Sequence, residues 1–221
     1  MVRTSTVALF MSLLWGSVVA ARDQAPNVID LADLADLYCV AADGDHDITW
    51  NRAEADGFSA LTPEQFKNLR LPGARDLRGY SRTVDGVEVR VLTARNTMSG
   101  MGGGATPFHL CWVSARPLDR REVERSFQHN LGQRGFRQER ARMFLWVPQP
   151  DGSNKPISRR EWSRYGQSIQ REMDARTLLI NDYMGMTAVT YIRALESCQD
   201  WCYAPGSSRG ALPAATAINP Q

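Results

Sequence analysis

The run from Thr106 to Ala115, TPFHLCWVSA, constrains the fold more than any other stretch of this chain. In an extended segment, alternate side chains point to opposite faces of a sheet. Both faces of this run are largely apolar, and they carry in turn Phe108, Leu110, Trp112 and His109, Cys111, Val113. A strand with two apolar faces is typical of the middle of a sheet. We therefore expect residues 106–115 to form a central strand that is covered on both sides.

The other periodic segments indicate an α+β fold. Asp85-Gly86 separates two alternating segments, 77–84 and 87–93, and this dipeptide is a strong hairpin signal. Further strands are predicted at 143–147, 176–183 and 186–193, and residues 96–105 are predicted to be a glycine-rich loop. Helical spacing or capping motifs predict short helices over 28–42, up to about 56, from Thr62, over 119–131 and from Ser158. We predict an antiparallel or mixed sheet of about five to six strands with short helices on one face.

The two ends of the chain differ in composition from the middle. Residues 1–21 contain one arginine, then an apolar run, then small residues, which is the pattern of a signal peptide. Residues 22–202 have no repeat or composition break and are predicted to be a single domain. Residues 203–221 are rich in small residues and proline and are predicted to be disordered. We expect a periplasmic or secreted protein without a transmembrane anchor after cleavage.

The charge of the chain is nearly balanced. Without Arg3, which lies in the predicted signal peptide, 25 basic residues remain against 24 acidic ones. This balance argues against nucleic acid as a partner, because nucleic-acid-binding domains usually carry a basic excess. The arginines at positions 134, 137, 140 and 142 predict at most a weak contact with an anionic surface.

Four cysteines, at positions 39, 111, 198 and 202, form an even set, so disulfides are expected in an exported chain. Three pairings are possible. We favour Cys39 with Cys111, which ties the first helix to the central strand, and Cys198 with Cys202. A zinc site of four thiolates is the alternative.

One candidate metal site lies between the first two predicted helices. Oxygen-bearing side chains occupy alternate positions and the last position of a twelve-residue segment: Asp43, Asp45, Asp47, Thr49, Asn51 and Glu54. The segment resembles the EF-hand calcium loop. The resemblance implies that Asp43, Asp45, Asp47, Asn51 and Glu54, with the Thr49 carbonyl, bind calcium. Ile48 stands where that family has its turn glycine. A second interpretation is that Asp43 and Gly44 end the first helix and that Asp47 caps the second.

No known catalytic motif occurs in the sequence, and no catalytic residue is assigned. His109 is the histidine of most interest, because it shares a strand face with Cys111 beside the glycine-rich loop. Met98, Met101, Met184 and Met186 form a further alternative, a Cu(I) site of thioethers. The sequence therefore predicts an exported binding or envelope-associated module without enzymatic activity. A calcium-binding domain and an enzyme that uses His109 are the alternatives.

Overall fold

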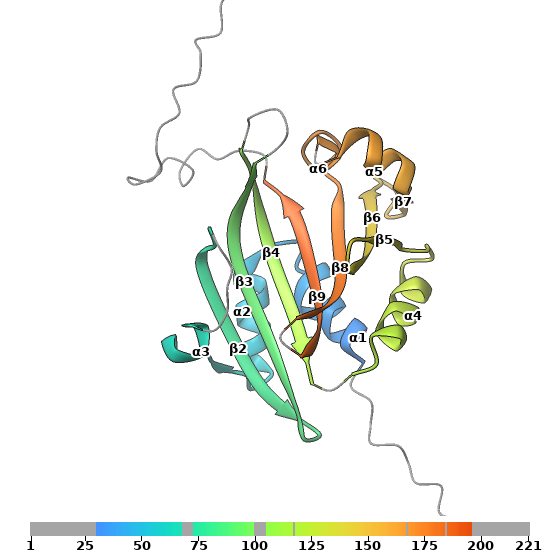
Figure 1. Cartoon of the computed structure of the whole chain (residues 1–221). Coiled ribbons are helices and arrows are strands. Elements are labelled where there is room, and N and C mark those ends of the chain that lie inside the picture. The colour runs from blue at the N-terminus through green and yellow to red at the C-terminus, as the bar shows by residue number, and fades with distance from the viewer. Residues whose placement is uncertain are drawn as a thin grey trace, which may run out of the picture.

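In the computed structural model, residues 30–67, 73–99, 105–116, 118–166, 168–183 and 185–195 are described. They form an α+β fold in which short helices pack on a strongly curved antiparallel sheet (Figure 1). The helices are α1 Leu31–Ala35, η1 Asp36–Val40, α2 His46–Ala55, α3 Pro63–Lys67, α4 Arg120–Asn130, α5 Arg159–Tyr165 and α6 Ser168–Glu172. The strands are β1 Ser59–Ala60, β2 Arg75–Val84, β3 Val87–Ser99, β4 Ala105–Ala115, β5 Phe136–Gln138, β6 Ala141–Pro148, β7 Asn154–Pro156, β8 Arg176–Tyr183 and β9 Met186–Ala194.

The sheet is built almost entirely from chain neighbours. Its strand order is β1-β2-β3-β4-β9-β8-β6-β5, and β7 pairs with β6. Among the described strands, two steps join non-consecutive neighbours, β4 to β9 and β8 to β6, and β4 lies in the middle of the sheet, as its two apolar faces predicted. Cys111, Trp112 and Val113 are all buried there.

The sheet has nine strands, so the expectation of five to six was wrong. The three additional strands, β1, β5 and β7, have only two or three residues each, which is too short for an alternating pattern to be visible. The expectation of a loop over residues 96–105 was also wrong in part. β3 extends to Ser99 and β4 begins at Ala105, because these residues continue the same antiparallel register.

Most helices begin at the residue that the capping motifs predicted. Asp119 caps α4, and Ser158 with Glu161 forms a reciprocal capping box at α5. The predicted fifth helix is two short helices, because Gly166 adopts a positive φ of 54° and ends α5.

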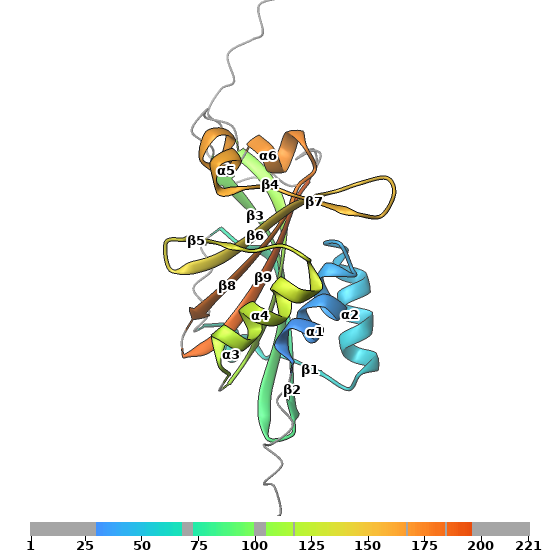
Figure 2. The ribbon, with the colours of Figure 1, turned by 90° about the vertical axis from the view of Figure 1, so that its right-hand side faces the viewer.

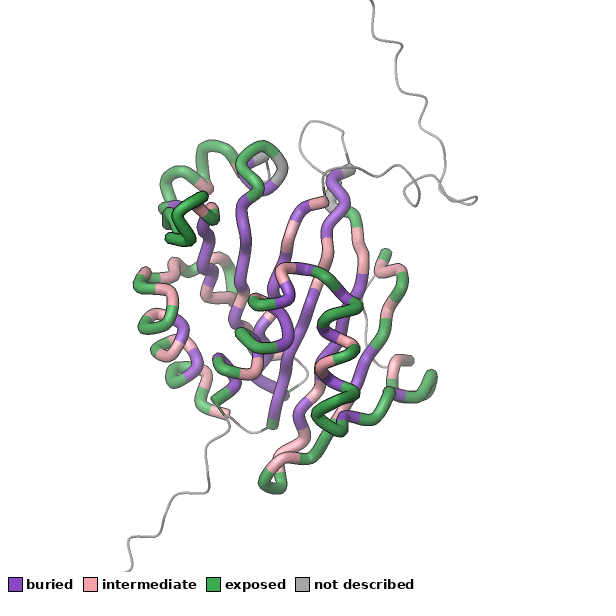
Figure 3. Tube along the Cα trace, turned by 180° about the vertical axis from the view of Figure 1, so that it is seen from behind, coloured by how far each residue is buried: buried purple, intermediate pink, exposed green. Residues whose placement is uncertain are grey.

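Helices cover both faces of the sheet, not one as expected. The larger core lies under α1, η1, α2 and α4, which share one side of the sheet in Figure 2. Seen from that side in Figure 3, buried residues line the strands beneath these helices. On the opposite face, α3 packs with Leu92 and Trp112, and α5 and α6 pack with Leu145. β4 and β6 carry apolar residues on both faces of the sheet, which explains why helices cover both faces.

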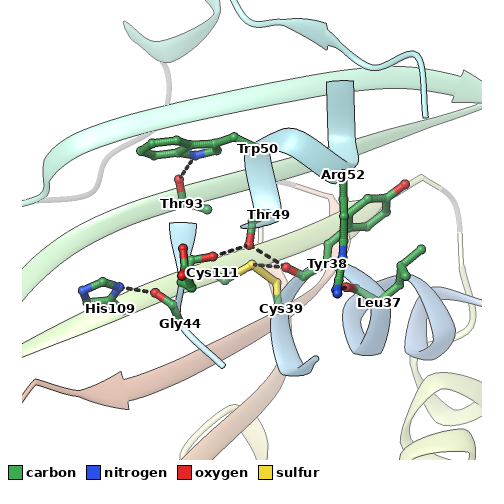
Figure 4. Close-up of a disulfide and its surroundings, with 11 residues drawn as sticks. Leu37, Tyr38, Cys39, Gly44, Thr49, Trp50, Arg52, Thr93, His109 and Cys111 are labelled. Atoms are coloured by element: carbon green, nitrogen blue, oxygen red, sulfur yellow. Dashed lines mark hydrogen bonds between the residues drawn. A yellow bond between two sulfur atoms is a disulfide. The ribbon is translucent and has the colours of Figure 1, made fainter. Parts of the chain in front are cut away.

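A disulfide joins η1 to β4 in the larger core. Cys39 and Cys111 are bonded, with a Cα–Cα distance of 5.5 Å, which confirms the favoured pairing (Figure 4). Both residues are buried. The bridge fixes the segment that leads into α2 against the middle of the sheet.

Several predictions lie outside the described residues. These are the signal peptide at 1–21, the pairing of Cys198 with Cys202, the tail at 203–221, and Met101 and Met184 of the proposed copper site. Within the described ranges, no helix is both long and apolar enough to cross a bilayer.

Candidate functional site

The candidate site is a cavity between the start of α2 and one end of strands β3, β4 and β9. Its volume is about 280 Å³, and a second hollow of about 310 Å³ adjoins it and shares four of its residues. The shared residues are His46, Asp47, Trp50 and Arg95. His109 and Arg193 complete the sheet side of the first cavity. We call the whole region the histidine–arginine pocket.

The turn before α2 places backbone atoms directly on the sheet. Asp43 and Gly44 both have positive φ, 47° and 81°. A Cβ atom on Gly44 would lie 3.3 Å from the Cβ atom of His109 and 3.4 Å from that of Arg193. Glycine therefore allows both the left-handed conformation and the close approach to β4 and β9.

This turn also orients His109. The Nδ1 atom of His109 is hydrogen-bonded to the Gly44 carbonyl (Figure 4). A carbonyl oxygen only accepts, so Nδ1 carries the proton and Nε2 presents its lone pair. The structure thus fixes one tautomer of His109, whose Nε2 is able to accept a proton or a hydrogen bond.

His46 packs beside His109. The two ring centroids are 4.4 Å apart, with an angle of 44° between the rings. His46 is 5% exposed, and neither of its ring nitrogens makes a hydrogen bond of normal geometry to any described residue. A buried polar group without a partner costs about 1–3 kcal/mol, and such groups are rare in native proteins. An imidazole with this incomplete hydrogen bonding therefore indicates that the pocket is a candidate binding site.

Both histidines are held neutral. Burial lowers the pKa of His46 to about 3, and repulsion from Arg95 and from a protonated His109 acts in the same direction, against smaller opposite effects of the Leu110 backbone and the charge of Asp45. Burial also lowers the pKa of His109, and Arg95 and Arg193 lower it further against the effect of the Gly44 carbonyl. At neutral pH the pocket thus contains two uncharged imidazoles next to two guanidinium groups.

Trp50 forms the wall between the two hollows. Its Nε1 atom donates a hydrogen bond to the Thr93 hydroxyl at 2.7 Å, and the Arg78 guanidinium lies 3.8 Å from its ring centroid. A cation over an indole face is an attractive contact. These contacts fix the indole ring, and Figure 4 shows its hydrogen bond to Thr93.

Asp43 lines the first cavity and belongs to an ion-pair network at its edge. Its carboxylate accepts hydrogen bonds from Arg176 at 2.8 Å and from the Tyr191 hydroxyl at 2.6 Å, and Arg193 lies 3.0 Å away. Burial alone would raise the pKa of Asp43, but the bonds from Arg176 and Tyr191 and the charge of Arg193 outweigh it, so this pKa is lowered. Asp174 is a second partner of Arg176, at 2.6 Å.

The structure does not bring the proposed calcium ligands together. Residues 46–55 form helix α2, so they do not form the open loop that EF-hand coordination requires. The positive φ angles occur at Asp43 and Gly44, not at Ile48. Within the described ranges, no three His, Cys, Asp or Glu side chains are arranged so that they could hold a metal ion. Calcium binding remains a prediction, without support from this arrangement.

Each of these residues has another place in the fold. Asp43 pairs with arginines, Asp45 caps α2 by accepting from the amides of Asp47 and Ile48, and Glu54 accepts a bond from Tyr80. Asp47 and Asn51 are exposed on α2. The geometry therefore favours a helix-capping role for the acidic segment, but the N-cap of α2 is Asp45 and not Asp47, which lies in the first turn.

Sequence reasoning named His109 but missed its neighbours. Arg95 lies opposite His109 in the register of β3 and β4, and Arg193 lies opposite it in the register of β4 and β9. The sequence did contain a signal for these neighbours, since each of them is a polar residue at the end of an otherwise apolar strand. Their meeting depends on the pairing of β4 with β9, which no local pattern specifies.

No protein-family model, curated protein or solved structure matches this chain, so its own geometry must support any functional assignment.

Proposed function

We propose that this protein is an exported binding module without enzymatic activity, and that its ligand binds in the histidine–arginine pocket. The observation that carries the proposal is His46, a buried imidazole at the wall of a cavity, whose ring nitrogens make no hydrogen bond of normal geometry to the described residues and have only a backbone contact with Leu110. Ligand-binding cavities characteristically combine apolar walls with a few polar groups that converge on the ligand. The ligand would supply the partners that the fold does not.

The disulfide supports both parts of the proposal. Cys111 follows His109 by two residues on the same face of β4, and its bond to Cys39 holds the turn that contains Gly44. The pocket is therefore preorganised by a covalent link, and preorganisation reduces the entropy lost on binding. A disulfide is also compatible with an oxidising compartment, as export requires.

The chain offers a direct test, because it contains only three histidines. His46 and His109 line the pocket, whereas His129 is exposed on α4 and serves as an internal control. Protein labelled at histidine is titrated with four probes at millimolar concentration: inorganic phosphate, glycine, choline and glucose. We expect at least one probe to shift the NMR signals of His46 and His109 and to leave that of His129 unchanged. If no probe does so, the pocket is not the binding site.

A second candidate function is hydrolysis with His109 as general base. The hydrogen bond of Nδ1 to Gly44 favours it, because Nε2 is then free to take a proton from water, and the lowered pKa keeps that atom unprotonated. This function predicts turnover of p-nitrophenyl acetate or p-nitrophenyl phosphate that is lost in His109→Gln. Turnover that the variant retains would exclude His109 as the base.

A further inference from the structure

A row of basic residues crosses four neighbouring strands at the sheet side of the pocket. Arg95 on β3 is the register partner of His109 on β4, His109 is the partner of Arg193 on β9, and Arg193 is the partner of Arg176 on β8. The four strands lie side by side in Figure 1. Like charges on directly opposite residues destabilise a sheet. His109 is neutral, so Arg193 and Arg176 are the directly opposite like charges in this row, and Arg95 is a third cation at its other end.

The fold supplies anions at one end of the row. Asp43 and Asp174 contact both Arg176 and Arg193, at distances from 2.5 to 3.8 Å. Two carboxylates therefore balance two guanidinium groups at this end.

The other end of the row is poorly balanced. Arg95 has one ion-pair contact among the described residues, to Asp76 at 3.5 Å, and both side chains are substantially exposed. A pair of this kind contributes little. The Nε atom of Arg95 is buried and has no hydrogen-bond partner in the described part of the chain. The unbalanced charge thus lies next to His109 and His46, inside the pocket.

We propose that Arg95 and His109 form an anion-binding floor, and that the ligand carries a carboxylate or phosphate group that binds there. This inference rests on the proposed function, because it names the ligand class of the same pocket. Guanidinium groups bind both kinds of oxyanion through charge-assisted hydrogen bonds. Asp45 and Asp47 also line the cavity, and the charge of Asp45 acts on both histidines, but both carboxylates are exposed and are therefore screened by water and salt.

Binding of an anion must be linked to proton uptake. The charged groups that face the histidine pair are Asp45 from the turn before α2, Arg95 from β3, Arg193 from β9 and, through its bond to Arg193, Asp43. The arginines disfavour imidazolium, and a bound anion offsets them. The bound anion therefore raises the pKa of both histidines, so binding takes up protons and becomes tighter as the pH falls.

The experiment compares ligands and variants on the full-length protein in low-chloride buffer. Inorganic phosphate and acetate are titrated against wild type, Arg95→Gln and Arg90→Gln, with the His46 and His109 signals as the readout. Arg90 is a matched control because it lies on the same strand, is paired with Glu88, and points to the other face of the sheet. We expect the affinity for the anion to fall by about tenfold or more in Arg95→Gln and to be unchanged in Arg90→Gln. In wild type, the affinity should rise from pH 7 to pH 6.

The outcomes separate the two proposals. A response to phosphate alone identifies a phosphate ligand, and a response to acetate alone identifies a carboxylate ligand. If choline or glucose shifts the signals but neither anion does, the pocket binds a ligand and the anion inference is wrong. If no probe has any effect, both proposals are wrong. An unchanged affinity in Arg95→Gln would also overturn the inference. The Arg95→Lys variant keeps the charge: if it binds the anion, the loss of binding in Arg95→Gln is due to the lost charge and not to misfolding.

Discussion

Replacement of Asp43 by asparagine distinguishes a structural role of the acidic segment from a calcium-binding role. Asp43 is the link between Arg176, Arg193 and Tyr191, and the Arg176 side chain is only 5% exposed. In Asp43→Asn, the amide oxygen still accepts from Tyr191, but the amide nitrogen faces guanidinium donors. The buried arginine then retains Asp174 as its carboxylate partner.

The magnitude follows from the burial of the two partners. Removal of one partner of a buried ion pair costs about 3–5 kcal/mol. The value must be reduced here, because the Asp43 side chain is 44% exposed and Asp174 remains in place. We expect the free energy of unfolding to fall by about 2–3 kcal/mol.

The assay is urea unfolding in the presence of EDTA, with Asp47→Asn as the matched control. Asp47 is exposed in the first turn of α2, and its replacement should cost no more than about 0.5 kcal/mol. A calcium site predicts a different result, in which both variants match wild type in EDTA and both lose stabilisation by added calcium. A loss in Asp43→Asn below about 0.5 kcal/mol in EDTA would falsify our account of the network.

Three further predictions concern stability. Below about pH 4, acid should reduce the stability of wild type more steeply than that of Asp43→Asn. The pKa of Asp43 is lower in the folded than in the unfolded protein, so its carboxylate contributes stability above the unfolded pKa, and this stability is lost as the pH falls through the folded pKa. Parallel acid profiles of the two proteins would contradict this. Reduction of the bond between Cys39 and Cys111, which are 72 residues apart, should lower the free energy of unfolding by about 4 kcal/mol in the chain-entropy model, and urea midpoints that agree with and without reductant would refute it. Replacement of Gly79 by alanine should cost about 1–3 kcal/mol, since its Cβ atom would lie 2.3 Å from Leu92 Cδ2; a variant as stable as wild type would show that Leu92 moves aside freely.

The sequence by itself determined the elements that depend on neighbouring residues. Asp85-Gly86 specified the hairpin of β2 and β3 because both turn residues adopt positive φ, and Ser158 with Glu161 specified the start of α5. The two apolar faces of β4 placed this strand in the middle of the sheet, and the pairing of Cys39 with Cys111 followed from that position. For the hairpin, the helix start and the strand, the residues that decide the structure are close in sequence, whereas Cys39 and Cys111 are 72 residues apart and their pairing was inferred from the expected place of β4.

The candidate site was decided by the tertiary structure alone. The acidic segment matched a calcium motif in spacing, yet long-range partners on β8 and β9 determine what Asp43 does. Arg95, His109 and Arg193 come from three strands, and they form one row only because β9 pairs with β4, which places Arg193 opposite His109, 84 residues earlier in the chain. Local patterns record which face a residue occupies, but they do not record which strand will lie beside it, because cross-strand pairing is set by packing of the whole sheet.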